Sequence, residues 1–202
     1  MSRYTGPKIR IIRRLGELPA LTTKKVKNNY PPGENGQLTK KLSEYAIRLQ
    51  EKQKIRFNYG INEKQLRRYV KKAKKSRGST GSYLLNLLEM RLDNIVLRAG
   101  LAPTIAASRQ LVSHKHIEVN NKIVNIPSFQ CSIGDTIHVK KSNKSRQLID
   151  LNSRRDTTKF FPKYLEVNKD NMGARVVKTM DKQDVNLTIN ELLVVEFYSR
   201  KG

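Results

Sequence analysis

The sequence of 202 residues is poor in the side chains that metal centres, disulfides and membrane spans require. Its single cysteine, Cys131, excludes internal disulfides and a thiolate-rich zinc site. No segment approaches the roughly 18 consecutive apolar residues that cross a bilayer. The N-terminus is basic but has neither the apolar core of a signal peptide nor the serine-rich character of a transit peptide. We therefore expect no metal, no membrane contact and a protein that works where it is made.

Acidic residues are also scarce, because 17 of them face 41 lysines and arginines, a net charge of +24. Such a surplus repels itself in a compact state unless a polyanion neutralises it. Apolar residues make up 37% of the chain, which is low for a globular protein of this size. Some parts should therefore become ordered only on a partner. This composition favours nucleic acid as the partner over an anionic membrane surface.

Residues 1–41 have no sustained hydrophobic period and are interrupted by prolines and glycines. They are either a disordered tail or an arm that folds against phosphates, and the short apolar pairs within them favour some docking. We interpret the segment as an extended basic arm.

Residues 42–90 are expected to form a helical domain, completed by residues 187–202, whose pattern is ambiguous between helix and strand. A first helix spans about 43–59, and a second begins after Asn62, an N-cap candidate with Gln65 three residues on. The second helix has an apolar stripe, and the rest of its surface is basic. Phosphate contact explains this face better than simple solvation, because solvated faces mix charges of both signs. A long apolar helix follows over about 82–99, capped by Ser79 or Thr80.

Residues 91–186 contain a short helix, TIAASRQLVSHK, and several strand patterns. Two alternating runs are joined at Asn120 and Asn121, a two-residue hairpin signal in which both residues take positive φ. Further strands are expected at DTIHVK, YLEVN and ARVVKTM, in an otherwise weakly patterned region. Helices first and a small antiparallel sheet later give an α+β chain.

His114 and His116, with Glu118 close behind, raise the question of a metal or acid/base site. Zinc needs three or four convergent ligands. These histidines lie where a helix gives way to a strand, so their directions diverge. We expect His114 to contact RNA as a neutral group and His116 to support the sheet.

The segments RLDNIVLRAG, SRQLVSHKHI, EVNNKIVNIPS and GDTIHV resemble the small RNA-binding module of the ribosomal protein S-four family, a helix pair followed by a β-hairpin. The resemblance extends to both ends of the chain, through MSRYTGPKIRIIRRLG, YPPGENG, LSEYAIRLQEKQKIRFNYG and INELLVVEFYSR. Several segments are similar to the cyanobacterial and plastid branch of that family. The resemblance thus implies a location in the chloroplast, with the bacterial cytoplasm as second choice.

The resemblance also implies a function. Family members are structural constituents of the small ribosomal subunit that bind its rRNA directly and nucleate assembly at a multi-helix junction in the 5′ domain. They lie near the point where mRNA enters, contribute to translation accuracy, and contact neighbouring small-subunit proteins, including the ribosomal protein five family. The resemblance implies no enzymatic activity and no cofactor.

The chain departs from the family pattern at three places. Family members often have Pro-Gly-Gln-His-Gly where this chain has Pro32-Gly33-Glu34-Asn35-Gly36. Basic residues commonly follow the turn at 32–36, but Leu38 and Thr39 intervene here, which predicts a weaker grip on mRNA. The hairpin has Asn121 where glycine is usual, at a small conformational cost. The cysteine cluster that binds zinc in some relatives is absent, so no metal is implied.

The predicted RNA contacts combine cations for phosphate with polar groups for 2′-hydroxyls. Arg109 is expected on the exposed side of the short helix, where it would clamp a phosphate through two hydrogen bonds. The full set is Arg3, Lys8, Arg10, Arg13, Arg14, Lys40, Lys41, Arg48, Lys52, Lys54, Arg56, Arg67, Arg68, Lys71, Lys72, Thr104, Ser108, Arg109, Gln110, Ser113, His114, Lys115, Asn120 and Lys122.

Two other interpretations use different residues. Arg91-Leu92-Asp93 mimics the catalytic triplet of pseudouridine synthases, which carry the same module, so Asp93 is a candidate catalytic residue. In those enzymes, however, a large catalytic domain follows the module. Arg91 and Asp93 could equally form a structural pair that orients the module. A free-standing RNA chaperone would need only the module and not the matching termini.

Overall fold

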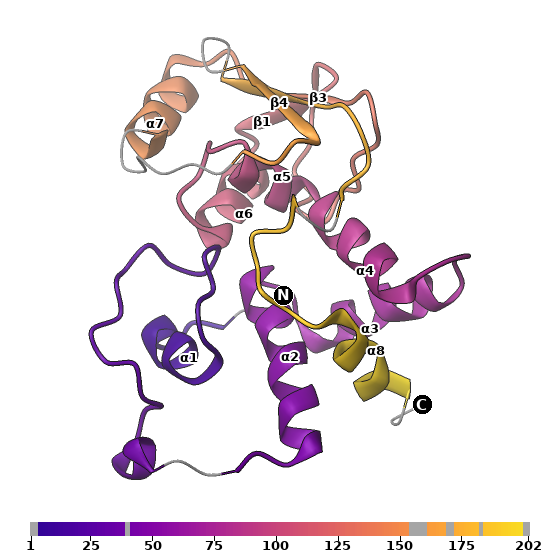
Figure 1. The fold of residues 1–202 in the computed structure, drawn as a ribbon. Coiled ribbons are helices and arrows are strands. Elements are labelled where there is room, and N and C mark those ends of the chain that lie inside the picture. Colours follow the sequence, from indigo (N-terminus) through magenta and orange to yellow (C-terminus); the bar gives the residue numbers. More distant parts are fainter. Residues whose placement is uncertain (1–3, 39–40, 154–160, 169–171, 182–183, 200–202) are drawn as a thin grey trace. The chain divides into compact units, whose positions relative to one another are not determined.

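The computed structural model describes residues 4–38, 41–153, 161–168, 172–181 and 184–199. The chain divides into two compact units, Met1–Leu85 with Leu187–Gly202, and Asn86–Asn186. Figure 1 shows helices in the first unit and a sheet with helices in the second. Within the described residues, every helix is too short or too polar to cross a membrane. The predicted α+β class is confirmed.

The central helices of the first unit are α2 (Glu44–Asn58) and α3 (Glu63–Lys74), close to the predicted bounds. Each begins at a side-chain cap, since the Ser43 hydroxyl accepts from the Ala46 N–H and Asn62 Oδ1 accepts from the Gln65 N–H at 2.7 Å. The ambiguous C-terminal pattern forms helix α8 (Glu191–Ser199), which lies beside α2 and α3 (Figure 1).

The N-terminal arm contains helices that the sequence did not predict, α1 (Lys8–Leu15) and the 3₁₀ turn η1 (Glu34–Gln37). One buried pair in α1, Ile11 and Leu15, is too short a pattern to give a sustained period. These side chains pack with Leu18 and Leu21, and the Ala20 N–H donates to Asn58 Oδ1 in α2. The arm is therefore docked on α2 over these residues.

The prediction of one long helix over 82–99 was wrong, because the structure has α4 (Thr80–Glu89) and α5 (Leu92–Arg98). The break occurs at Arg91, which is extended and forms an antiparallel bridge with Gln130. Backbone N–H groups of Leu92 and Cys131 donate to Phe129 O and Met90 O, both at 2.9 Å. A loop far away in sequence thus supplies hydrogen bonds that replace the helical ones.

The second unit contains a five-stranded antiparallel sheet of order β2-β1-β3-β5-β4. The elements are α6 (Ile105–Ser113), β1 (Ile117–Val119), β2 (Lys122–Ile123), β3 (Thr136–Val139), α7 (Asn143–Ser153), β4 (Leu165–Asn168) and β5 (Gly173–Val176). Helix α7 was not predicted. Alternate residues of the strands, such as Ile137 and Val139, join one core with α5 and α6.

Candidate nucleic-acid interface

A strongly basic exposed surface of the first unit lies on α3. Its apolar residues Leu66, Val70 and Ala73 are at most 2% exposed, so the opposite face is turned to solvent. Within the described part of the chain, no carboxylate forms an ion pair with this face. Its exposed cations are Lys64, Arg67, Arg68, Lys71, Lys72, Lys74 and Lys75. We call the predicted four, Arg67, Arg68, Lys71 and Lys72, the α3 basic face.

The predicted contacts on α2 have a different environment, because each has a partner inside the unit. Arg48 binds Glu196 and Glu44 at 2.8 and 2.9 Å, and these hydrogen bonds, Glu196 foremost, raise its pKa. Lys52 is buried and binds Glu63 at 2.9 Å. Lys54 binds Glu51 at 2.6 Å, and the Arg56 guanidinium lies over the Phe57 ring. These four cations are therefore already engaged by groups within unit 1.

The Lys52–Glu63 pair belongs to a larger contact among α2, α3 and α8. Burial raises the pKa of Glu63, but hydrogen bonds from Tyr198 and Lys52 outweigh burial and leave it below its usual value. The Glu63 carboxylate is therefore ionised at neutral pH, where it holds Lys52 and Tyr198.

In the arm, Arg10, Arg14 and Lys41 are exposed, and Lys8 is half-buried. Arg13 Nε donates to Tyr30 O at 2.9 Å, and its guanidinium lies 4.8 Å from the centre of the Tyr30 ring. Arg13 thus links α1 to the segment at Tyr30 within the arm. The predicted contacts Arg3 and Lys40 lie outside the described residues.

In the second unit, the end of α6 and the hairpin bring predicted contacts together. Helix α6 ends at Ser113 with His114 as its C-cap, and Lys115 takes a φ of 63°, which turns the chain into β1. Asn120 and Asn121 take φ values of 49° and 62°, as the hairpin pattern predicted. The exposed residues of this surface are Gln110, Ser113, His114, Lys115, Asn120 and Lys122.

Two predicted contacts in α6 are buried instead, and the expected exposure of Arg109 was wrong. Ile105, Ser108, Arg109 and Val112 follow helical spacing and form the buried face of α6. The Ser108 hydroxyl donates to the Asp93 carbonyl oxygen, and Arg109 Nε lies 3.9 Å from Asp93 Oδ2. Thr104 is half-buried and caps the helix by accepting from the Ala107 N–H.

Asp93 is fully buried and forms the structural pair with Arg91 that was one of the two open interpretations. Arg91 Nε and Nη2 donate to the two Asp93 carboxylate oxygens at 3.0 and 2.6 Å, and both side chains are 0% exposed. A uridine cannot reach this carboxylate in the folded unit. The geometry therefore counts against Asp93 as a catalytic residue.

A second buried carboxylate, Glu89, lies at the end of α4. It accepts from Asn94 at 2.6 Å, from Tyr164 at 2.8 Å and from Arg98 at 2.9 Å. These partners come from α5 and from the segment before β4, so one carboxylate joins three parts of unit 2. Sequence patterns did not indicate this network.

His114 and His116 lie in different environments. His116 Nδ1 lies 2.9 Å from Ser145 Oγ in α7, and burial, followed by the charges of His114 and Lys140, lowers its pKa. His114 is exposed, with its ring 6.2 Å from that of His116. Over the described residues, no three His, Cys, Asp or Glu side chains cluster in a way that could hold a metal. Burial raises the pKa of Cys131 to about 12, so its thiol is protonated.

Comparison with protein families and with known proteins identifies relatives of this chain. Residues 3–89 match the family model described as ribosomal protein S4/S9 N-terminal domain, and residues 90–137 match the S4 domain. The chain is 96% identical over 202 residues to "Small ribosomal subunit protein uS4c-1" of Cyanidium caldarium, with both chains fully covered. It is 56% identical over 201 residues to uS4 of Thermosynechococcus vestitus and to uS4c of Pyropia yezoensis, again over full length.

These relatives confirm the family resemblance and its plastid and cyanobacterial type. They also support the predicted location in the chloroplast or, as second choice, the bacterial cytoplasm.

Proposed function

Since this chain belongs to the uS4 family of small ribosomal subunit proteins, we propose that it is a structural constituent of the small ribosomal subunit and binds the rRNA of that subunit. The observation that carries the proposal is the α3 basic face, an array of exposed cations without acidic partners among the described residues. Such cations release condensed counterions when they neutralise phosphates, which drives association at moderate salt.

The proposed contact surface keeps the predicted residues that are available to a partner. In unit 1 these are the α3 basic face together with Arg10, Arg14 and Lys41. In unit 2 they are Gln110, Ser113, His114, Lys115 and Lys122, whose mixture of cations, an amide, an imidazole and a hydroxyl suits phosphates and 2′-hydroxyls. The predicted contact Asn120 is exposed, but its amide is already bonded to Asp135 and Thr136. Arg109 and Ser108 position this surface from within the unit.

The finer role follows the family. We infer that the protein binds rRNA early, at a multi-helix junction of the 5′ domain, and nucleates assembly there. It would lie near the point where mRNA enters, contribute to translation accuracy, and contact neighbouring ribosomal proteins, including the protein five family. Residues 1–41 would act as the arm, 42–90 with 187–202 as the helical domain and 91–186 as the module. The side chain of Leu38 is 63% exposed, which supports a weaker electrostatic grip on mRNA at this turn.

The test is the salt dependence of binding to a 5′-domain fragment of small-subunit rRNA. Replacing the four residues of the α3 basic face by glutamine should lower affinity roughly a hundredfold at moderate salt. It should also reduce the slope of log affinity against log salt by about 4, since each phosphate contact contributes about 1.

A variant with the same loss of charge is the control. Lys141, Lys144, Arg146 and Lys163 are exposed and lie outside both the arm and the proposed surface, so their replacement by glutamine should change affinity much less. An equal loss in both variants would show that net charge, not the α3 basic face, drives binding. A wild-type chain that does not bind the fragment would reject the function itself.

A further inference from the structure

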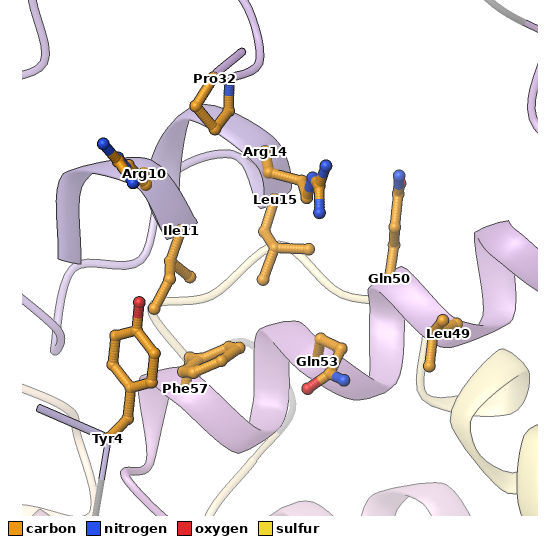
Figure 2. Close-up of a pocket in the computed structure, with 10 residues that line it drawn as sticks. All are labelled: Tyr4, Arg10, Ile11, Arg14, Leu15, Pro32, Leu49, Gln50, Gln53 and Phe57. Carbon is orange, nitrogen blue, oxygen red and sulfur yellow. The ribbon is translucent and has the colours of Figure 1, made fainter. Parts of the chain in front are cut away.

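A pocket of about 400 Å³ lies between α1 and α2 in the first unit (Figure 2). This volume is within the range of sites that hold small organic groups. Because α1 was not predicted, no sequence pattern indicated a pocket here. Its lining combines apolar side chains, two amides and two guanidinium groups. The rRNA contacts proposed above include the two arginines, but not the apolar walls or the amides.

The apolar walls come from both helices. Figure 2 shows Ile11 and Leu15 pointing from α1 toward Phe57 and Gln53 on α2. The ring of Tyr4 packs edge-to-face on Phe57, with centroids 5.3 Å apart. Such a lining suits a flat apolar group, and base stacking on aromatic side chains is a common mode of RNA recognition.

The polar groups of the pocket are two amides one helical turn apart, Gln50 and Gln53, both half-buried. Gln53 Oε1 is buried and accepts no hydrogen bond from the described residues. Buried amide oxygens normally have a partner, so this one marks a place where a ligand donor would fit. Amide side chains donate and accept side by side, which matches the edge of a nucleobase.

The rim of the pocket is positive. Arg10 and Arg14 are exposed, and no acidic residue is among those that line the pocket. In Figure 2 the Arg14 side chain extends over the opening toward Gln50. An anionic group attached to the buried part of a ligand would meet Arg14 at this rim.

We propose that this pocket binds one unpaired nucleotide of the small-subunit rRNA, with the base between α1 and α2 and the phosphate at Arg14. The proposal rests on the function proposed above, and adds to it a site where shape and hydrogen bonding, rather than charge alone, select the RNA. A peptide of a neighbouring protein would fit the apolar walls but would not require two arginines at the rim.

The test uses the full chain bound to the 5′-domain rRNA fragment, with chemical probing of the Watson–Crick edges of unpaired bases. The wild type should protect one unpaired nucleotide that the variant Gln50→Met with Gln53→Met leaves reactive at saturation. Methionine keeps the volume and helix propensity of glutamine. Affinity should fall about tenfold, and the salt slope should not change because no charge is lost. Arg14→Gln should reduce the slope by about 1.

Gln147→Met, an exposed position of α7, is the matched control and should keep the protection. Ultraviolet cross-linking of the wild-type complex gives a readout that does not depend on how a variant folds, and should join RNA to peptides containing Tyr4 or Phe57. Equal protection by the wild type and the double variant, or cross-links that avoid these peptides, would reject the pocket while leaving rRNA binding intact. A wild type that does not bind RNA would reject both proposals.

Discussion

The arginines of α3 and two arginines of the second unit, Arg91 and Arg98, serve different purposes. On α3, Arg67 and Arg68 are exposed, and no described carboxylate lies within ion-pair distance of them. In the second unit, Arg91 is 0% exposed and forms two hydrogen bonds with Asp93, while Arg98 is bound to Glu89. All four contribute equally to the net charge of +24, but only those on α3 are available to a polyanion.

Net charge therefore overstates the capacity of the chain to bind RNA. A buried cation is neutralised inside the fold, and its role is to hold the elements that carry the exposed cations. Helix geometry decides between the two roles, since Arg109 lies on the buried stripe of α6 and Gln110 is exposed one position later. Paired substitutions of like residues in the two environments test this distinction.

The largest effect is expected from Asp93→Ala, which leaves Arg91 buried without its carboxylate. Removing one partner of a buried ion pair costs about 3–5 kcal/mol. Urea unfolding of the full chain, followed by circular dichroism, measures the loss.

Asp181→Ala is the matched control, because Asp181 is 66% exposed and pairs with Lys178 at 2.9 Å on the surface. Exposed pairs contribute little, so the urea midpoint should not move measurably. Similar midpoints for both variants would show that burial does not separate the two kinds of pair.

Arg109→Ala should lower the free energy of unfolding by about 1–3 kcal/mol, because a charged partner of Asp93 and its packing are lost. The salt slope of rRNA binding should not change, since Arg109 is buried and lies against Asp93 inside the unit. Lys115→Gln should do the reverse, reducing the slope by about 1 without changing stability. A reduced slope for Arg109→Ala would return it to the RNA surface that the sequence first suggested.

In the hairpin, the side chain of Asn120 is bonded within the fold, whereas Asn121 is exposed. Asn120 Nδ2 donates to Asp135 Oδ1 at 2.8 Å, and Asn120 Oδ1 accepts from the Thr136 N–H at 3.0 Å. Asn120→Gly should therefore cost about 1–2 kcal/mol of unfolding free energy. Asn121 is exposed with a φ of 62°, so Asn121→Gly should stabilise by roughly 0.5 kcal/mol. Thermal unfolding of both variants measures the two changes in unfolding free energy. Changes of the same sign would show that the two asparagines do not have these different roles.

Local sequence chemistry predicted much of the fold because its signals act over a few residues. The cap at Asn62, the positive φ of Asn120 and Asn121 and the basic face of α3 were all predicted from neighbours in sequence. Family resemblance added the identity of the module. Helix α1 has one buried pair of residues, which is too few to give a recognisable hydrophobic period in the sequence.

The remaining features depend on partners far apart in sequence. Helix α4 ends because the backbone of residues 90–92 pairs with the loop at 129–131. Arg48 is occupied by Glu196 of α8, a contact that no local pattern of α2 reveals. The pocket between α1 and α2 likewise forms only after the arm docks. Charge patterns alone therefore could not separate paired cations from available ones.

The smallest expected effect concerns His116, whose pKa is lowered by burial, then by His114 and Lys140. Because the unfolded chain has the ordinary pKa of about 6.5, it binds protons more readily than the folded chain. Stability present above that pKa is therefore lost as pH falls through it toward the folded pKa. His116→Gln keeps a polar partner for Ser145 but cannot titrate. Urea midpoints between about pH 7.5 and pH 5.5 should fall less in this variant than in the wild type. An identical fall would mean that other groups, such as the carboxylates, govern the acid sensitivity of the fold.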